Sequence, residues 1–129
     1  MQADGTFDVK LTPQTASAEM ETTKIGRMRI DKQFQGDLTA VGLGEMLAFR
    51  TVVEGSAGYV AMEHETGILL GRTGSFVLQH SGTMNRGASS LVLTVVPDSG
   101  TDALTGLSGS MAIRIEEGKH LYTMECALP

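Results

Sequence analysis

Glu63 and Arg72 are the two charged residues whose spacing in this sequence could support chemistry inside a folded domain. They belong to two β-type runs, residues 59–65 and 68–81, which are separated by Thr66-Gly67. We expect a two-residue hairpin turn there, because glycine adopts positive φ at no steric cost. Glu63 and Arg72 then lie on one face of the hairpin as diagonal neighbours.

The face that carries Glu63 and Arg72 also carries Tyr59, Phe76 and Leu78, which favours an interior position over a surface ion pair. On the surface such a pair contributes well under about 1 kcal/mol. In the interior each charge loses hydration worth several kcal/mol, so each needs a partner. A polar pair in an apolar cavity can orient a ligand or hold a reactive water, and it can equally be a structural brace.

Three further residues are candidates for the same interior. Glu45 interrupts the apolar face of the preceding strand, and His80 shares the face of Glu63. Tyr122, in the last hairpin, would close the far wall. No catalytic residue is assigned. The predicted ligand-binding residues of the cavity are Glu45, Tyr59, Glu63, Arg72, Phe76, His80 and Tyr122.

Other chemistries lack the residue patterns that they need. The three histidines have no close histidine or carboxylate neighbour at ligand spacing, so no metal site is predicted. No nucleotide-binding motif is present, so no cofactor is predicted, and Gly42 and Gly44 are attributed to close strand packing or bulges. Cys126 has no partner base and is expected to be a small buried side chain rather than a nucleophile.

The composition is that of one ordinary globular domain. Its 129 residues are enough to bury a core, and the 19% of charged residues is typical of a protein in water. The net charge of −5 argues against a nucleic-acid or anionic membrane partner. A single cysteine fits a reducing compartment, and the first residues have no signal-peptide pattern, so we expect a cytoplasmic protein.

The elements that must position these residues are strands. Alternating side chains and turn residues predict seven to nine strands and no segment with a helical period. Residues 84–90 are expected to form a polar loop, and residues 97–109 a turn-rich segment. The expected strands are residues 5–12, 23–34, 37–51, 59–65, 68–81, 90–96, 110–116 and 120–128.

Two further hairpins follow from glycine-containing pairs. A turn at Gln35-Gly36 sets Ile30 against Val41 and Met28 against Leu43, so that the apolar residues coincide. The last hairpin turns at Glu117-Gly118. Its more apolar face carries Met111, Ile113, Ile115, His120, Tyr122, Met124 and Cys126.

Strand-turn-strand order throughout predicts an all-β domain with antiparallel pairing between neighbours in sequence. Without helices, an open sheet would leave one apolar face in water and two edges unpaired. Closure into a single antiparallel barrel of about eight strands removes both defects. A two-sheet sandwich is the competing architecture.

The opposite face of the central hairpin is apolar as well. If Tyr59 points inward, an apolar set on the other face points outward, and no predicted helix covers it. We therefore expect a homo-oligomer with strands 58–62 and 69–77 in its interface, and a symmetric dimer on general grounds. The outward set is Val60, Met62, Leu69 and Val77.

Two segments resemble the bacterial family known as domain of unknown function 3224: GRTGSFVLQHSGT at 71–83 and VVPDSGTDALTGLSGSM at 95–111. The strings GTFDV and FQGDL fit the same pattern, so the resemblance covers nearly the whole chain. That family is similar to the allene oxide cyclase barrel, which implies eight antiparallel strands around a cavity and keeps a trimer open. Leu11 departs from the pattern, where an aromatic residue is expected. No catalytic residue of the cyclases is carried over.

Two functions follow as hypotheses. In the first, the barrel binds a small apolar or amphipathic molecule in its interior, with isomerisation or cyclisation as a further option. In the second, the protein is a non-enzymatic structural or assembly module whose barrel is filled by side chains. An interior void of roughly 300 Å³ or more would favour the first.

Overall fold

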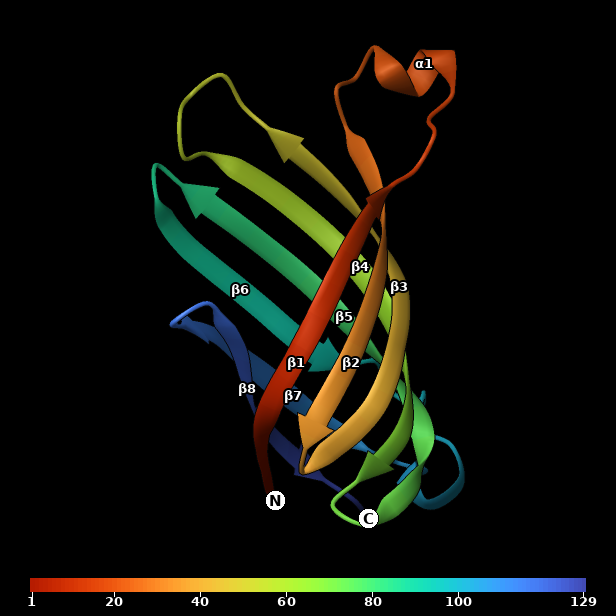
Figure 1. Ribbon diagram of the computed structural model, residues 1–129. Helices are drawn as coiled ribbons and strands as arrows, with labels where there is room; N and C mark the ends of the chain where they lie inside the picture. The colour runs from red at the N-terminus through yellow and green to blue at the C-terminus, as the bar shows by residue number, and fades with distance from the viewer.

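The computed structural model describes residues 1–129 and is a closed antiparallel barrel of eight strands paired in sequence order (Figure 1). The predicted fold class is therefore confirmed. One short helix, α1 (Ala18–Glu21), and one 3-10 turn, η1 (Asp102–Leu104), interrupt the strand order. The strands are β1 (Gln2–Pro13), β2 (Gly26–Gly36), β3 (Leu38–Arg50), β4 (Ala57–Leu69), β5 (Arg72–Asn85), β6 (Ala88–Val95), β7 (Ser108–Glu116) and β8 (Lys119–Ala127).

The barrel has two distinct ends. The termini end, at the bottom of Figure 1, holds both chain termini, the β2–β3 and β4–β5 turns and the connection with η1. The α1 end holds the helix and the β3–β4 and β5–β6 connections, in the upper part of Figure 1, and the β7–β8 turn at its left side. Strand β6 shares only the pair Thr94–Ser110 with β7, so the wall is least tightly paired there.

Three hairpins close through two-residue turns whose second residue is glycine. Both residues have positive φ at Leu70-Gly71 (49° and 81°), Arg86-Gly87 (49° and 92°) and Glu117-Gly118 (51° and 78°). This is the turn geometry that matches the twist of paired strands. The predicted turn at Glu117-Gly118 is confirmed. The predicted polar loop at residues 84–90 was wrong, because β5 and β6 continue up to Arg86-Gly87.

The turn of the central hairpin was predicted four residues too early. Thr66-Gly67 lies inside β4, and the chain turns at Leu70-Gly71. Gly67 is needed in the strand because a Cβ there would collide with the backbone of Thr39 and Ala40 in β3. The glycine therefore marks a close approach between strands rather than a turn.

This displacement separates the predicted ion pair. Glu63 pairs with Leu78 across the hairpin, whereas Arg72 pairs with Leu69 at the exposed tip. The prediction that Glu63 and Arg72 are neighbours in the interior was therefore wrong. The turn moves by four residues, which is an even number, so the residues predicted to share one face of the hairpin still share it. Phe76 and His80 accordingly point inward with Glu63.

The register of β2 and β3 also differs from the prediction. Ile30 pairs with Gly44 rather than with Val41, a shift of three residues that turns the other face of β3 inward. The last pair between β2 and β3 is Phe34–Ala40, and the Tyr122 hydroxyl lies against the backbone of the connection beyond that pair. That hydroxyl accepts a hydrogen bond from the Leu38 backbone N–H (2.9 Å).

The reversed face of β3 moves one predicted cavity residue to the outside. Glu45 lies on the outer surface, so its interior placement was wrong. Val41 and Leu43 are outside too, at 59% and 50% exposure. Their inward positions are occupied by small residues, among them Ala40 and Gly42.

The core is densest at the termini end. The Phe34 ring packs against those of Phe7 (5.4 Å between centroids) and Tyr122 (5.5 Å). Leu104 and Leu107, from the connection between β6 and β7, are buried over the same end. This half of the barrel is filled by side chains.

Candidate functional site

Inward side chains change in character along the barrel axis. Above the aromatic core, two successive rows of directly paired residues cross β2, β3, β4 and β5 and bring charges into the interior. The rows are Lys32–Gly42–Glu65–Phe76 and Ile30–Gly44–Glu63–Leu78. We call Lys32, Glu63, Glu65 and His80 the charged layer.

Glu63 is the centre of the charged layer. Its side chain is fully buried, and Oε2 lies 3.0 Å from Lys32 Nζ and 3.1 Å from His80 Nε2. Lys32 is itself almost fully buried, and its ammonium lies 4.7 Å from the centre of the Phe7 ring. A buried carboxylate with an ammonium partner and a second hydrogen bond meets the conditions under which a buried charge is tolerated.

Glu65 follows two residues later on β4 and is also fully buried. With both carboxyl groups ionised, Glu63 Oε1 and both oxygens of Glu65 have no hydrogen-bond partner. Burial, together with the hydrogen bond to Glu63 and its negative charge, raises the pKa of Glu65 to about 10. At neutral pH Glu65 is therefore a neutral carboxylic acid that donates a hydrogen bond to the Glu63 carboxylate.

The pKa of Glu63 moves in the opposite direction. Burial alone would raise it, but the hydrogen bonds from His80 and Glu65 and the charge of Lys32 outweigh burial. They lower the pKa of Glu63 to about 2, so this carboxylate stays ionised. The charged layer consequently holds one negative charge, on Glu63, and one positive charge, on Lys32.

Gly42 makes room for the two carboxyl groups. A Cβ at this position would collide with Glu65 Oε2 and would lie 3.0 Å from Glu63 Oε1. The sequence interpretation of Gly42 as a site of close packing is thus correct, although the close partner is a pair of side chains.

Tyr59 connects the charged layer to the α1 end. Its hydroxyl lies 3.3 Å from His80 Nδ1, and the other nitrogen of the same ring contacts Glu63. The Tyr59 ring lies over Gly82, where a Cβ would collide with it. Burial and the nearby charge of Glu63 raise the pKa of Tyr59, so the hydroxyl keeps its proton.

A pocket of about 670 Å³ opens at the α1 end. It is mostly apolar and Tyr59 forms part of its wall. Arg50 and Arg114 also belong to the lining. The residues that line it include Met46, Ala48, Tyr59, Met84, Leu91, Ile113 and Ile115, the last of which is 66% exposed.

The predicted cavity residues fall into three groups. Tyr59, Glu63 and His80 form one connected chain between the pocket and the charged layer. Phe76 is buried beside Glu65 in the filled half. Tyr122 is buried at the termini end, where its hydroxyl also donates to the Gln35 carbonyl (2.9 Å), so it braces the β2–β3 connection. The remaining two, Glu45 and Arg72, are exposed.

Sequence reasoning missed Lys32 and Glu65. Both carried a signal: Lys32 alternates with Ile30 and Phe34 on one face of β2, and Glu65 lies two residues from Glu63 on one face of β4. The sequence analysis assigned neither of them to the interior, and lysine and glutamate are rarely buried in general.

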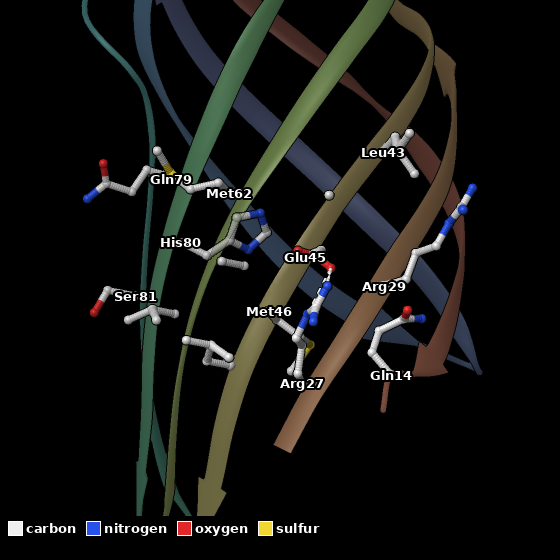
Figure 2. A pocket seen from close by; sticks show the side chains of 14 residues that line it. Gln14, Arg27, Arg29, Leu43, Glu45, Met46, Met62, Gln79, His80 and Ser81 are labelled. Atoms are coloured by element: carbon white, nitrogen blue, oxygen red, sulfur yellow. Dashed lines mark hydrogen bonds and ion pairs between the residues drawn. The ribbon is translucent and has the colours of Figure 1, made fainter. Parts of the chain in front are cut away.

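A second concave surface lies on the outside of β2–β5 and is the region drawn in Figure 2. This outer groove has a volume of about 1080 Å³, and Leu43, Leu47, Val60 and Met62 are 45–52% exposed along it. Arg27 and Glu45 form an exposed ion pair (2.7 Å) at its edge. Leu69 was predicted to share this face, but it is only 1% exposed and points inward.

Two structural observations bear on the metal and membrane expectations. No group of three or more histidine, cysteine, aspartate or glutamate residues is placed to hold a metal ion. None of the helices has the length and apolar character required to cross a bilayer. Cys126 is buried, and burial raises the pKa of its thiol.

Comparison with known proteins identifies a family and one close structure. The family model described as "Protein of unknown function (DUF3224)" matches residues 3–126. A crystal structure of a DUF3224 protein of unknown function from Shewanella oneidensis MR-1 is 51% identical, with a TM-score of 0.94 over 100% of this chain and 97% of that chain. No curated protein matches the chain. The resemblance predicted from residues 71–83 and 95–111 is confirmed, and the barrel agrees with the cyclase-like fold that it implied.

Proposed function

The chain belongs to the DUF3224 family, and we propose that its barrel binds a small apolar or amphipathic molecule in the pocket at the α1 end. The observation that carries this proposal is the volume of about 670 Å³. It lies within the roughly 300–1,000 Å³ of small-molecule sites, which are mostly apolar with a few convergent polar groups. Met46, Met84 and Leu91 would contact the apolar part of the ligand.

Isomerisation or cyclisation of the bound molecule would require a group that exchanges a proton with it. Tyr59 presents a hydroxyl on the pocket wall, and this hydroxyl is linked through His80 to the ionised Glu63. This chain of groups supports catalysis as an extension of the binding proposal.

The rival function, a structural module with a filled barrel, describes the termini half of the molecule well. The two functions differ in what enters the α1 half. Titration with the uncharged fluorescent probe N-phenyl-1-naphthylamine tests this directly, because its fluorescence rises when it leaves water for an apolar site.

Matched tryptophan variants locate the probe. Ala48 lines the pocket, whereas its neighbour Leu47 points to the outer groove. We expect Ala48→Trp to abolish probe binding and Leu47→Trp to leave it intact. Equal binding by both variants, or no binding by the wild-type protein, would contradict the proposal. Native mass spectrometry of protein from its own host then searches for a retained molecule.

We also propose that the outer groove is an interface between copies of this chain. A contiguous apolar strip on an uncovered sheet face is uncommon in a soluble monomer. The rim carries both charge signs, in Arg27 and Glu45, which suits a surface that meets a copy of itself. A dimer is favoured, and the cyclase resemblance keeps a trimer open.

A further inference from the structure

Two residues closer to the termini end, His80 and Glu63, determine whether the Tyr59 hydroxyl donates or accepts a hydrogen bond. Glu63 is ionised and can only accept hydrogen bonds, so the nitrogen of His80 that faces it, Nε2, carries a proton. The hydrogen of one ring nitrogen is thereby assigned. The polarity of Tyr59 then depends on whether Nδ1 of His80 also carries one.

The role of Nδ1 follows from the geometry of the imidazole ring. An imidazole with one N–H has one donor nitrogen and one acceptor nitrogen. Nε2 is the donor, because it faces the Glu63 carboxylate, and Nδ1 faces the Tyr59 hydroxyl. Nδ1 is therefore an acceptor.

The Tyr59 hydroxyl consequently donates its only proton downward, to His80 Nδ1. The lone pairs of the Tyr59 oxygen then remain free to accept a hydrogen bond at the wall of the pocket. The pocket thus presents a hydrogen-bond acceptor at this position, although tyrosine is a donor in many binding sites. A ligand group that reaches it must bring its own proton.

We infer that the ligand is an amphipathic alcohol, whose hydroxyl donates a hydrogen bond to the Tyr59 oxygen while its hydrocarbon part lies along the methionines of the pocket. This inference rests on the proposed function and specifies its substrate class. A ketone or ester has no proton to donate to Tyr59. A carboxylate would also place a negative charge on the side of Tyr59 and Glu63, which is repulsive.

A rival orientation would put a negatively charged ligand at the rim of the pocket. Arg50 lies there, at the end of β3, and could pair with a carboxylate whose hydrocarbon tail points down toward Tyr59. The two orientations make opposite predictions about which of Tyr59 and Arg50 determines affinity.

The test uses three probes of equal chain length: 1-decanol, 2-decanone and decanoate. Each displaces the uncharged probe N-phenyl-1-naphthylamine from the full-length protein, and the displacement gives a dissociation constant. We expect decanol to bind about five- to tenfold more tightly than the ketone, which corresponds to one hydrogen bond. We expect decanoate to bind more weakly than decanol.

Two variants assign the preference to its cause. Tyr59→Phe removes the acceptor and should bring decanol down to the affinity of the ketone, leaving the ketone unchanged. His80→Leu releases the Tyr59 proton for the ligand, so the ketone should gain affinity until it equals decanol. A positioning residue that merely supported the fold would weaken both probes together. Circular dichroism verifies that each variant is folded. If His80→Leu does not fold, the loss of the alcohol preference in Tyr59→Phe is the deciding result.

Other results would overturn the inference. Equal affinity of the wild-type protein for decanol and 2-decanone would refute a proton-accepting Tyr59 while leaving the binding function standing. Tightest binding of decanoate, abolished by Arg50→Gln and not by Tyr59→Phe, would replace the alcohol with an anionic ligand at the rim. Failure of all three probes to displace the fluorophore, or of the fluorophore to bind, would remove the proposed function and this inference with it.

Discussion

The two tyrosines of this chain lie at opposite ends of one barrel, and their hydroxyl groups are used differently. Tyr122, at the termini end, hydrogen bonds to the backbone N–H of Leu38 and lies within reach of the carbonyls of Gln35 and Leu38. Tyr59, at the α1 end, has one partner, His80. The Tyr122 hydroxyl has backbone partners for both donating and accepting, whereas the Tyr59 hydroxyl can still form a hydrogen bond with another group.

The surroundings of the two residues differ in the same way. Tyr122 packs edge-on against Phe34 and is fully buried. Tyr59 lies among methionines and small residues on the wall of the pocket. Methionine adapts to irregular shapes, whereas interlocked aromatic rings specify one arrangement. The termini half of the barrel is therefore the more rigidly packed half, and the α1 half contains the pocket.

The largest expected loss of stability concerns the charged layer that separates the two halves. Glu63→Gln leaves the Lys32 ammonium without its carboxylate, and breaking a buried pair typically costs about 3–5 kcal/mol. We expect a smaller loss, about 2–3 kcal/mol in urea denaturation, because Glu65 can ionise and pair with Lys32. Replacing Lys32 by methionine in the same variant should recover part of it.

A surface pair supplies the control for this measurement. Glu45→Gln removes the exposed partner of Arg27, and such pairs contribute well under about 1 kcal/mol. If Glu63→Gln changed the free energy of unfolding as little as Glu45→Gln, the charged layer would be solvated rather than buried.

The second prediction compares the tyrosines by the same substitution. Tyr122→Phe leaves the Leu38 N–H and the Gln35 carbonyl without their partner, which should cost about 1–3 kcal/mol. Tyr59→Phe removes one bond in a partly open site and should cost less than about 1 kcal/mol. Urea denaturation measures both. A larger loss at Tyr59 than at Tyr122 would reverse the assignment of rigidity to the termini end.

The third prediction uses pH to separate the two glutamates. The folded-state pKa of Glu65 is raised, so its contribution to stability is full below about 4.5 and is lost progressively as pH rises toward 10. The pKa of Glu63 is lowered, so its contribution is present above about 4.5 and is lost as pH falls toward 2. The two groups therefore act in different pH windows.

Glu65→Gln isolates the first window. Glutamine can still donate to Glu63 but cannot ionise, so the variant should gain up to about 5 kcal/mol over the wild-type protein at pH 8, at about 1.4 kcal/mol for each pH unit above 4.5. At pH 4.5 the two proteins should differ little. A gain that is equal at both pH values would mean that Glu65 is not protonated in the native state.

Sequence reasoning predicted the barrel but not its registers, and particular residues show why. Alternation along each strand and glycine-containing turns sufficed for the closed antiparallel fold, and Glu117-Gly118 was placed correctly. The central hairpin contains two pairs that could form its turn, Thr66-Gly67 and Leu70-Gly71. The close contact of Gly67 with β3 excludes the first pair. That contact involves a third strand, so it cannot be inferred from the sequence of the hairpin alone.

The same limit applies to the candidate site. Glu63, His80 and Tyr59 were assigned to one inward face because an even shift in register preserves faces. Glu45 was misplaced because the β2–β3 connection is contacted by Tyr122, which lies 84 residues after Leu38. Lys32 could be recognised as buried only after those registers were known, since it pairs with Glu63 on β4. Glu65 could be recognised only with the burial of the whole site, since its partner is the neighbouring carboxylate of Glu63.

The last prediction concerns the outer groove. The two ends of the barrel differ in how their interiors are packed, and this difference should not affect association through the outer face. Met62 is 51% exposed on the outer face of β4, so Met62→Lys should change the free energy of unfolding of the isolated chain by no more than about 0.5 kcal/mol. In a self-association through the groove, the same lysine would place an unpaired charge in a buried interface. Thr66→Lys, on the same face but outside the groove, is the matched control. Light scattering at micromolar concentration should give an oligomer for the wild-type protein and Thr66→Lys, and a 13.7 kDa species for Met62→Lys. A wild-type monomer would contradict the proposed interface and would show that the apolar strip is left exposed to water.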